Sequence, residues 1–295
     1  MPKLAVAGDT VLGRGVAACL AERRPQELVS PELVEVAHAA DVFVLNLECC
    51  SSERGQPWPD PWKPFFFRAP PAAVETLAHL GVDCVTLANN HALDFGAEAA
   101  RAPVVLECAD FRLRVVAVAD RPREYAADGQ PGIAFADLWR ASPPEWLLES
   151  VRAPGADAVL VTPHWGPNMA PEPAPHVRRA AVALVEAGAT LVAGHSAHVF
   201  QGVAGRVLYD LGDFLDDYAV DPLLRNDLGL LFLVDLDESG PRRLEAIPLK
   251  LDYRHTRLAE GEDAEWIRQR FRRACAALGT EVSEEAGRLV IAWPS

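Results

Sequence analysis

The chain has 295 residues, of which half are hydrophobic, and its formal net charge is -14 at pH 7. This hydrophobic content is enough for a large core, so we expect one domain over residues 1–295. The negative charge argues against a nucleic-acid partner, because phosphate contacts need a basic surface. No apolar run reaches the roughly 18 residues of a membrane span, so no membrane partner is expected either, and the oligomeric state stays open.

The N-terminus leads directly into a strand-like segment at residues 3–7, with no basic leader, apolar segment and cleavage site before it. We therefore expect a cytoplasmic protein. Six cysteines occur without a single Cys-x-x-Cys pair, which predicts reduced, mostly buried thiols and not a cysteine zinc site.

The first three predicted strands all end in polar side chains. Asp9 follows the strand at residues 3–7, and Glu48 follows the strand at residues 42–45. The strand at residues 84–87 leads into Asn89-Asn90-His91-Ala92-Leu93-Asp94-Phe95-Gly96. Such a polar group after a buried strand is costly unless something organises it, and a metal ion would do so. A polar turn, in which the amides and the imidazole bind backbone groups, is the alternative.

A long loop is expected between residues 51 and 71, where prolines and tryptophans are frequent. It carries several aromatic side chains beside Lys63 and Arg68. Long loops in compact domains are often functional, so this one is a candidate wall of a pocket for an anionic or peptide-like ligand. A loop packed on its own aromatic side chains explains the same composition equally well.

The second half of the chain repeats the pattern of strands that end in polar residues. A strand at residues 158–162 leads into His164, and a strand at residues 190–193 leads into His195 and His198. The other predicted elements are a strand at 112–119, an antiparallel pair at 228–234 and 244–251, and helices at 31–40, 72–80, 176–187 and 263–278.

In sheets flanked by helices, ligands bind outside the carboxyl ends of the strands, which is where these polar residues fall. Carboxylates are hard oxygen donors and imidazoles are borderline nitrogen donors, a mixture that suits Mn, Fe, Zn or a similar divalent metal. A pair of ions sharing a carboxylate is therefore plausible. Each residue alone has an ordinary explanation, such as a helix cap for Asp9 or a core histidine for His164. Six such coincidences at successive strand ends favour a shared metal site.

Taken together, these residues resemble the CapA family, which is named for poly-γ-glutamate capsule synthesis and belongs to the calcineurin-like metallophosphatase superfamily. The resemblance runs in the family's order from about residue 3 to residue 252. It is carried by Gly-Asp9-x-x-Leu-Gly-Arg14, Asn46-Leu-Glu48, Asn89-Asn90-His91-Ala-Leu-Asp94-Phe-Gly96, His164-Trp165, Gly-His195-x-x-His198 and Leu-Tyr209-x-Leu-Gly-Asp213-Phe. It implies an α/β fold, a four-layer αββα sandwich of the calcineurin-like metallophosphoesterase type.

The resemblance also implies roles for individual residues. The expected ligands of two divalent ions are Asp9, Glu48, Asn90, His164, His195 and His198, with Glu48 in the place of the bridging acid. His91 matches the superfamily's histidine that contacts substrate or donates a proton, and Asp94 and Asp213 are further catalytic candidates. Substrate contacts are expected from Arg14, Asn46, Asn89, Lys63, Arg68, Trp165 and Tyr209.

Three departures from the family pattern bear on the chemistry. Val11 stands where the superfamily usually has a histidine, which implies that one metal is held loosely or is absent. Asp213 stands where family members often have asparagine, which adds a candidate acid or base. The capsule proteins are usually exported or membrane-anchored, and the lack of an anchor here weakens a role in capsule synthesis.

Three functions stay open from the sequence. The first is a metal-dependent hydrolase that cleaves a phosphoester or a γ-glutamyl or other peptide amide with metal-activated water. The second is a cytoplasmic metal-dependent peptide epimerase that moves the α-proton by acid/base chemistry in natural-product maturation. The third is a non-catalytic accessory protein of poly-γ-glutamate synthesis.

Overall fold

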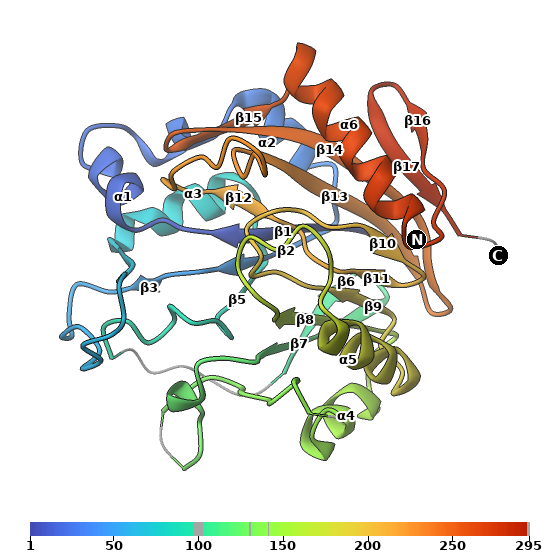
Figure 1. Ribbon diagram of the computed structural model, residues 1–295, viewed down its shortest axis with the longest axis horizontal. Helices are drawn as coiled ribbons and strands as arrows, with labels where there is room; N and C mark the ends of the chain where they lie inside the picture. Colours follow the sequence, from blue (N-terminus) through green and yellow to red (C-terminus); the bar gives the residue numbers. More distant parts are fainter. Residues whose placement is uncertain (97–102, 130, 141, 294–295) are drawn as a thin grey trace.

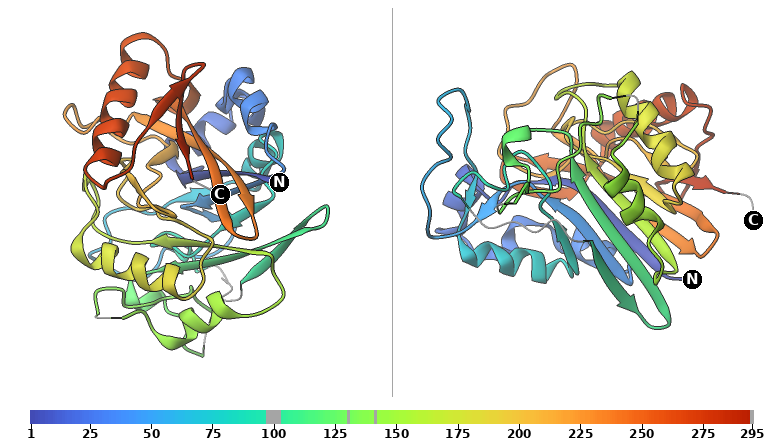
Figure 2. Two further views of the ribbon diagram at one scale, coloured as in Figure 1. Left: turned by 90° about the vertical axis from the view of Figure 1, so that its right-hand side faces the viewer. Right: turned by 90° about the horizontal axis from the view of Figure 1, so that it is seen from below.

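The computed structural model describes residues 1–96, 103–129, 131–140 and 142–293. Two β-sheets pack face to face in it, and helices cover the outer face of each sheet (Figure 1, Figure 2). The four-layer αββα sandwich expected from the sequence is confirmed.

The larger sheet is built around β1, which pairs in parallel with β2 and β12 and antiparallel with β13. Within the described residues, its order is β16-β17-β14-β13-β1-β2-β5, with β12 beside β1 and β15 beside β14. The strands are β1 (Lys3–Thr10), β2 (Val42–Leu47), β5 (Cys84–Thr86), β12 (Asp213–Leu215), β13 (Leu228–Asp237), β14 (Gly240–Asp252), β15 (His255–Leu258), β16 (Ser283–Glu285) and β17 (Arg288–Ala292).

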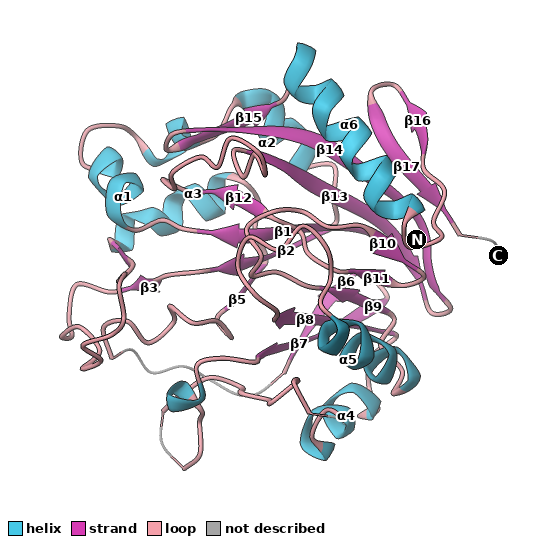
Figure 3. Ribbon diagram, viewed as in Figure 1, coloured by secondary structure: helices cyan, strands magenta, loops and turns pink. Residues whose placement is uncertain are grey.

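The smaller sheet has the order β10-β11-β9-β8-β7-β6. Its strands are β6 (Val104–Cys108), β7 (Phe111–Ala119), β8 (Ala158–His164), β9 (Leu191–Ala193), β10 (Val203–Ala204) and β11 (Val207–Leu208). The parallel strands β7, β8 and β9 deliver their carboxyl ends to one edge of this sheet. A separate two-stranded ladder joins β3 (Cys50–Ser51) to β4 (Arg68–Ala69), and the chain between them is a loop without regular structure (Figure 3).

Helices cover the outer faces of both sheets, and one further helix packs on an inner face. Those on the larger sheet are α1 (Arg14–Leu20), α2 (Pro31–Ala37) and α3 (Val74–His79), and those on the smaller sheet are α4 (Glu145–Arg152) and α5 (Pro175–Glu186). Helix α6 (Gly261–Ala276) packs on the inner face of β13 and β14, where Phe271 contacts Phe232. Short 3-10 turns occur at Pro25–Leu28, Pro71–Ala73 and Arg123–Tyr125.

Alternation along the strands explains how the layers form. In β13, Phe232 and Val234 belong to the core between the sheets, whereas Leu231 and Leu233 belong to the core under α1, α2 and α3. Successive side chains of a strand point to opposite faces, so a strand that is apolar throughout must be covered on both faces.

The predicted helices and strands are found at or near their predicted positions, but helices α1 and α4 and several strands, among them β6, were not predicted from the sequence. All five side chains of β6 are exposed or half-buried, so the strand lacks the buried apolar pattern of the predicted strands. The six thiols are free, as expected, with four buried and Cys84 and Cys108 partly exposed. Among the described helices, none is both long and apolar enough to cross a bilayer.

Candidate metal centre

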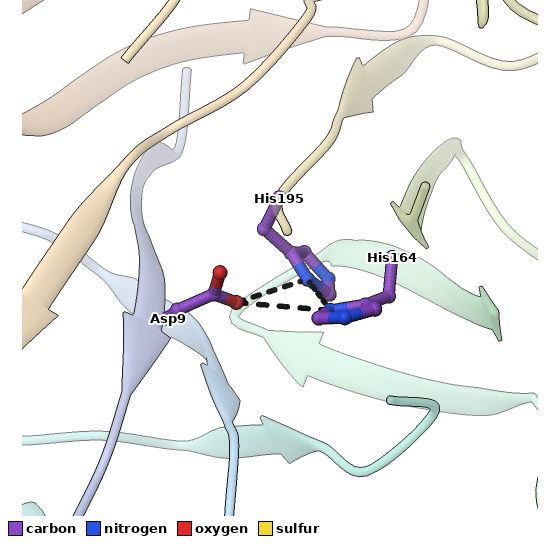
Figure 4. A group of neighbouring side chains, drawn as sticks. All are labelled: Asp9, His164 and His195. Atoms are coloured by element: carbon purple, nitrogen blue, oxygen red, sulfur yellow. Dashed lines mark hydrogen bonds and ion pairs between the residues drawn. The ribbon is translucent and has the colours of Figure 1, made fainter. Parts of the chain in front are cut away.

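Side chains from both sheets meet at the carboxyl ends of the parallel strands. Asp9 ends β1, His164 ends β8, and His195 and His198 follow β9. Asp9 Oδ1 lies 3.3 Å from His195 Nδ1 and 3.8 Å from His164 Nδ1 (Figure 4). Asp9 Oδ2 lies 3.4 Å from His198 Nδ1. The convergence predicted for these four residues is therefore present.

The cluster divides into two groups that share Asp9. One contains Asp9, His164 and His195, and the other contains Asp9, His198 and Asp213, and all five side chains are buried. Within each group the donor atoms lie within 4.8 Å of one another. The facing nitrogens His164 Nδ1 and His195 Nδ1 are 2.9 Å apart, a spacing that suits two ligands of one ion.

Glu48 also spans the two groups. Its Oε1 lies 4.0 Å from His164 Nε2, and its Oε2 lies 4.0 Å from His198 Nδ1. Glu48 Oε1, Asn90 Oδ1 and Asp213 Oδ2 are buried and have no hydrogen-bond partner among the described residues. Buried oxygens without partners are costly, and a cation in the cluster would satisfy those of Glu48 and Asp213, so the donor set fits a divalent metal.

The electrostatics point the same way. Burial, together with the charge of Asp9, raises the pKa of Glu48 well above its usual value. Burial, with Asp216 and Asp9 nearby, does the same to the pKa of Asp213. Burial lowers the pKa of His164 well below its usual value, which keeps the imidazole neutral and able to bind a metal. Crowded carboxylates beside the neutral imidazole of His164 form a site that a bound cation would stabilise.

Asn46 and Asn89 form a hydrogen-bonded chain to Asp9. Asn46 Nδ2 donates to Asp9 Oδ1 at 2.7 Å, and Asn89 Nδ2 donates to Asn46 Oδ1 at 3.0 Å. Both amides are buried, so the geometry gives them the role of orienting Asp9. Their predicted contact with substrate stays a prediction.

Ser196 and Arg121 hold the turn between the two ligand histidines. The backbone N–H of Ser196 donates to Asp9 Oδ2 at 3.0 Å, and its φ of +114° is unusual for a serine. Arg121 Nη2 donates to Ser196 Oγ and also to Asn168 Oδ1 at 3.2 Å. The guanidinium therefore secures a strained turn beside the metal centre.

His91 and Asp94 form a second buried pair. Asp94 Oδ2 lies 2.7 Å from His91 Nδ1, and Lys63 Nζ lies 3.0 Å from Asp94 Oδ1. The ring of Phe67 stacks on His91 with centroids 3.8 Å apart. Burial lowers the pKa of His91, although Asp94 opposes this effect. The neutral ring can donate from Nδ1 to Asp94, which leaves Nε2 for proton transfer.

A cavity of about 260 Å³ lies beside this pair. Lys63, Asn90, Arg121 and Tyr125 line its wall, and Trp58 and Trp62 of the long loop also line it. The aromatic loop thus does line a pocket, as the sequence left open. Arg121 lines this cavity and donates to Ser196 Oγ beside Asp9, so the cavity adjoins the metal centre.

The other residues predicted to contact substrate have partners within the protein, and their contact with substrate stays a prediction. Arg14 contacts Asp217 at 3.4 Å, and Arg68 lies over the ring of Phe95 at 3.6 Å. Trp165 is buried and donates from Nε1 to the backbone oxygen of Tyr209 at 2.9 Å. Trp165 and Tyr209 both belong to the hydrophobic core around α5, so packing alone explains an aromatic residue at each position.

Two residues near the centre were missed from the sequence. Tyr218 OH donates to Glu48 Oε2 at 3.3 Å, and nothing local in the sequence marks this tyrosine. Arg121 comes just after β7, at the carboxyl end of a parallel strand. The position just after a predicted strand identified His164 and His195, and the same criterion could have identified Arg121.

Comparison with known proteins supports the resemblance to the CapA family. The family model described as "Bacterial capsule synthesis protein PGA_cap" matches residues 3–102 and 97–218. The chain is 28% identical to a probable polyglutamine synthesis accessory protein of Mycobacterium tuberculosis, over 87% of this chain and 78% of that protein. It is 23% identical to the PGA biosynthesis protein CapA of Bacillus subtilis, over 83% of this chain and 70% of that protein.

A short stretch and one solved structure add to these matches. The chain is 33% identical to the capsule biosynthesis protein CapA of Bacillus anthracis over 100 residues, 32% of this chain and 24% of that protein. The crystal structure of a hypothetical protein from Thermus thermophilus has a TM-score of 0.50 and 15% identity, over 85% of this chain and all of that one. That likeness concerns the fold alone.

Proposed function

The chain belongs to the family of the bacterial capsule synthesis protein PGA_cap, and on this basis we propose that it is a divalent-metal-dependent hydrolase of the CapA type. The bond that it cleaves would be a phosphoester, a γ-glutamyl amide or another peptide amide. The observation that carries the proposal is the pair of buried donor groups that share Asp9, with an unpaired oxygen of Glu48 beside both.

Asp9, Glu48, Asn90, His164, His195 and His198 would hold the metal, with Asp213 as a further donor. Bound divalent ions would polarise the phosphoryl or acyl oxygen of the substrate and lower the pKa of a water molecule. Asp9 and Glu48 each lie near histidines of both donor groups, so both carboxylates would contribute to holding the metal.

His91 is the proposed proton carrier. Since burial lowers the pKa of His91, its neutral ring would take up at Nε2 the proton that the attacking water loses and would then give it to the leaving group. Asp94 accepts from Nδ1 and stabilises the charged ring in between, and the Phe67 ring fixes its plane. The cavity at Lys63 and Arg121 would receive the anionic or peptide-like part of the substrate.

The first experiment is metal analysis followed by assay. Protein loaded with Mn or Zn is tested on p-nitrophenyl phosphate, a phosphodiester analogue and a γ-glutamyl anilide. His91→Asn should reduce turnover on whichever substrate reacts by about 10² to 10⁴-fold. The matched control is His79→Asn at the end of α3, which should leave turnover unchanged. Loaded protein that is inert on all three substrates would contradict the proposal.

A peptide epimerase is the second candidate, and one observation favours it. Two groups that can carry protons, His91 and Tyr218, both contact the Phe67 ring, at centroid distances of 3.8 and 5.9 Å. Burial raises the pKa of Tyr218, so its hydroxyl would act as the acid and His91 as the base. Uptake of deuterium from heavy water at an α-carbon of a peptide, without cleavage, would select this candidate.

The relatives' printed names favour a third candidate, an accessory role in polymer synthesis without turnover. A protein that binds metal but neither hydrolyses nor exchanges protons would support it. The cytoplasmic location expected from the sequence remains a prediction that cell fractionation would test.

A further inference from the structure

A cavity of about 380 Å³ lies between the start of α5 and the second half of α6, apart from the metal centre. Three arginines line it, Arg178, Arg270 and Arg273, against a single carboxylate, Glu172. Such a concentration of positive charge is unexpected in a chain whose formal net charge is -14.

These three guanidinium groups have no carboxylate partner within ion-pair distance in the described part of the chain. Arg178 and Arg273 each donate from Nε to a backbone oxygen, of Pro173 at 3.1 Å and of Gln269 at 3.3 Å. Neighbouring arginines of α6 behave differently, because Arg272 Nη2 contacts Glu284 Oε2 at 2.5 Å. The absence of partners is therefore a property of the cavity and not of the whole helix.

Arg270 is the most confined of the three. Its Nη2 is buried without a hydrogen-bond partner, and its guanidinium lies 5.2 Å from the Phe200 ring and 5.3 Å from the Trp266 ring. Burial and the neighbouring charge of Arg273 lower the pKa of Arg270. A buried donor on a charged group costs free energy until an acceptor reaches it.

We propose that this cavity is a binding site for a multiply charged oxyanion, independent of the metal centre. The charge of Arg270 in the wall would attract the ligand, and the exposed guanidinium groups of Arg178 and Arg273 would bind its oxygens from the rim. A planar guanidinium group can form two parallel hydrogen bonds to the oxygens of a phosphate or a carboxylate. A ligand that carries either group therefore fits the cavity. The volume exceeds that of a single phosphate ion, which favours a larger ligand such as a polyphosphate or a short chain of carboxylates.

A glycine just before β10 (Val203–Ala204) allows α6 to pack closely beside the cavity. Gly202 lines the cavity, and a Cβ atom there would lie 2.4 Å from the backbone oxygen of Ala274. The helix backbone therefore rests directly on this glycine. The contact fixes the position of α6, and with it Arg270 and Arg273, against this wall of the cavity.

Titration calorimetry on the full-length protein tests the proposal. The protein is stripped of metal with a chelator and dialysed, so that a metal-bound anion cannot contribute. Tripolyphosphate and tri-γ-glutamate are the two probes, and the tighter one identifies the source of the oxyanion. We expect one-to-one binding that weakens at least tenfold in the double variant Arg178→Gln/Arg273→Gln, both of whose side chains are at the rim.

Two further variants keep the result interpretable. Arg272→Gln removes one positive charge from α6 at an arginine that is paired with Glu284. The affinity of this variant for the probe should stay within twofold of that of the wild type. Arg270→Lys keeps a cation over the rings but loses the fork, and it should also weaken binding. The proposal fails if neither probe binds at millimolar concentration, if the double variant binds as the wild type does, or if Arg272→Gln weakens binding as much as the double variant.

Discussion

Asp94 receives four donor groups, and its replacement by asparagine should cost the protein much of its stability. Its carboxylate accepts from the backbone N–H of Phe67 at 2.6 Å and lies 2.7 Å from His91 Nδ1. It also contacts Lys63 Nζ at 3.0 Å and Tyr125 OH at 3.3 Å. The Asp94 side chain is fully buried, and that of Lys63 is only 11% exposed.

The magnitude follows from these contacts. Asparagine offers one acceptor oxygen, and its NH₂ group would face donors that need an acceptor. The ammonium group of Lys63 would lose its counter-charge while keeping one hydrogen bond, to the backbone oxygen of Asn90 at 2.8 Å. Removing one partner of a buried ion pair costs about 3–5 kcal/mol. Because Lys63 keeps that bond, we expect a loss of about 3 kcal/mol for Asp94→Asn.

Urea unfolding monitored by circular dichroism measures this loss. The matched control is Asp60→Asn in the neighbouring loop, whose exposed carboxylate accepts from the backbone N–H of Trp62 at 2.8 Å. An amide oxygen can replace that acceptor, so the control should stay within about 0.5 kcal/mol of the wild type. An NMR titration should also find a lower pKa for His91 in Asp94→Asn, because Asp94 raises it. A loss below about 1 kcal/mol for Asp94→Asn would refute the reasoning.

The remaining predictions concern the metal centre and acid stability. Arg121→Met removes the hydrogen bond to Ser196 Oγ and should weaken metal binding about 10–100-fold by calorimetry; unchanged affinity would rule out the anchoring role. Gly8→Ala places a Cβ atom 1.9 Å from a backbone oxygen, so the unfolding free energy should fall by about 1–3 kcal/mol or more; a neutral effect would contradict this contact. Burial alone would raise the pKa of Asp227. Hydrogen bonds from Arg225 and Lys250 outweigh burial, so the pKa is lowered. The unfolded state therefore binds more protons in acid, and the stability that Asp227 contributes is present above about pH 4 and lost as the pH falls through its folded pKa. Asp227→Asn should be less stable than the wild type at pH 7 by a margin that shrinks below about pH 4, and a margin independent of pH would disprove this linkage.

The central strands and the candidate ligand residues were accessible from the sequence because their signals are local. An apolar run followed by a polar side chain marks both a buried strand and its carboxyl end, which is how Asp9, His164 and His195 were found. Strand β6 escaped because an exposed edge strand has no such run. Tyr218 escaped because its importance depends on a contact with Glu48, 170 positions away in the chain.

The sequence by itself determined which residues end the central strands and hence which donors are available for a metal. Only the tertiary structure decided how those donors are shared, because both oxygens of Asp9 are assigned by contacts from the opposite sheet. It alone revealed the arginine cavity, since Arg178 and Arg270 lie on helices that are far apart in the chain. Local patterning fixes secondary structure through the periodicity of burial, whereas the pairing of charges depends on which surfaces the two sheets and their helices bring together.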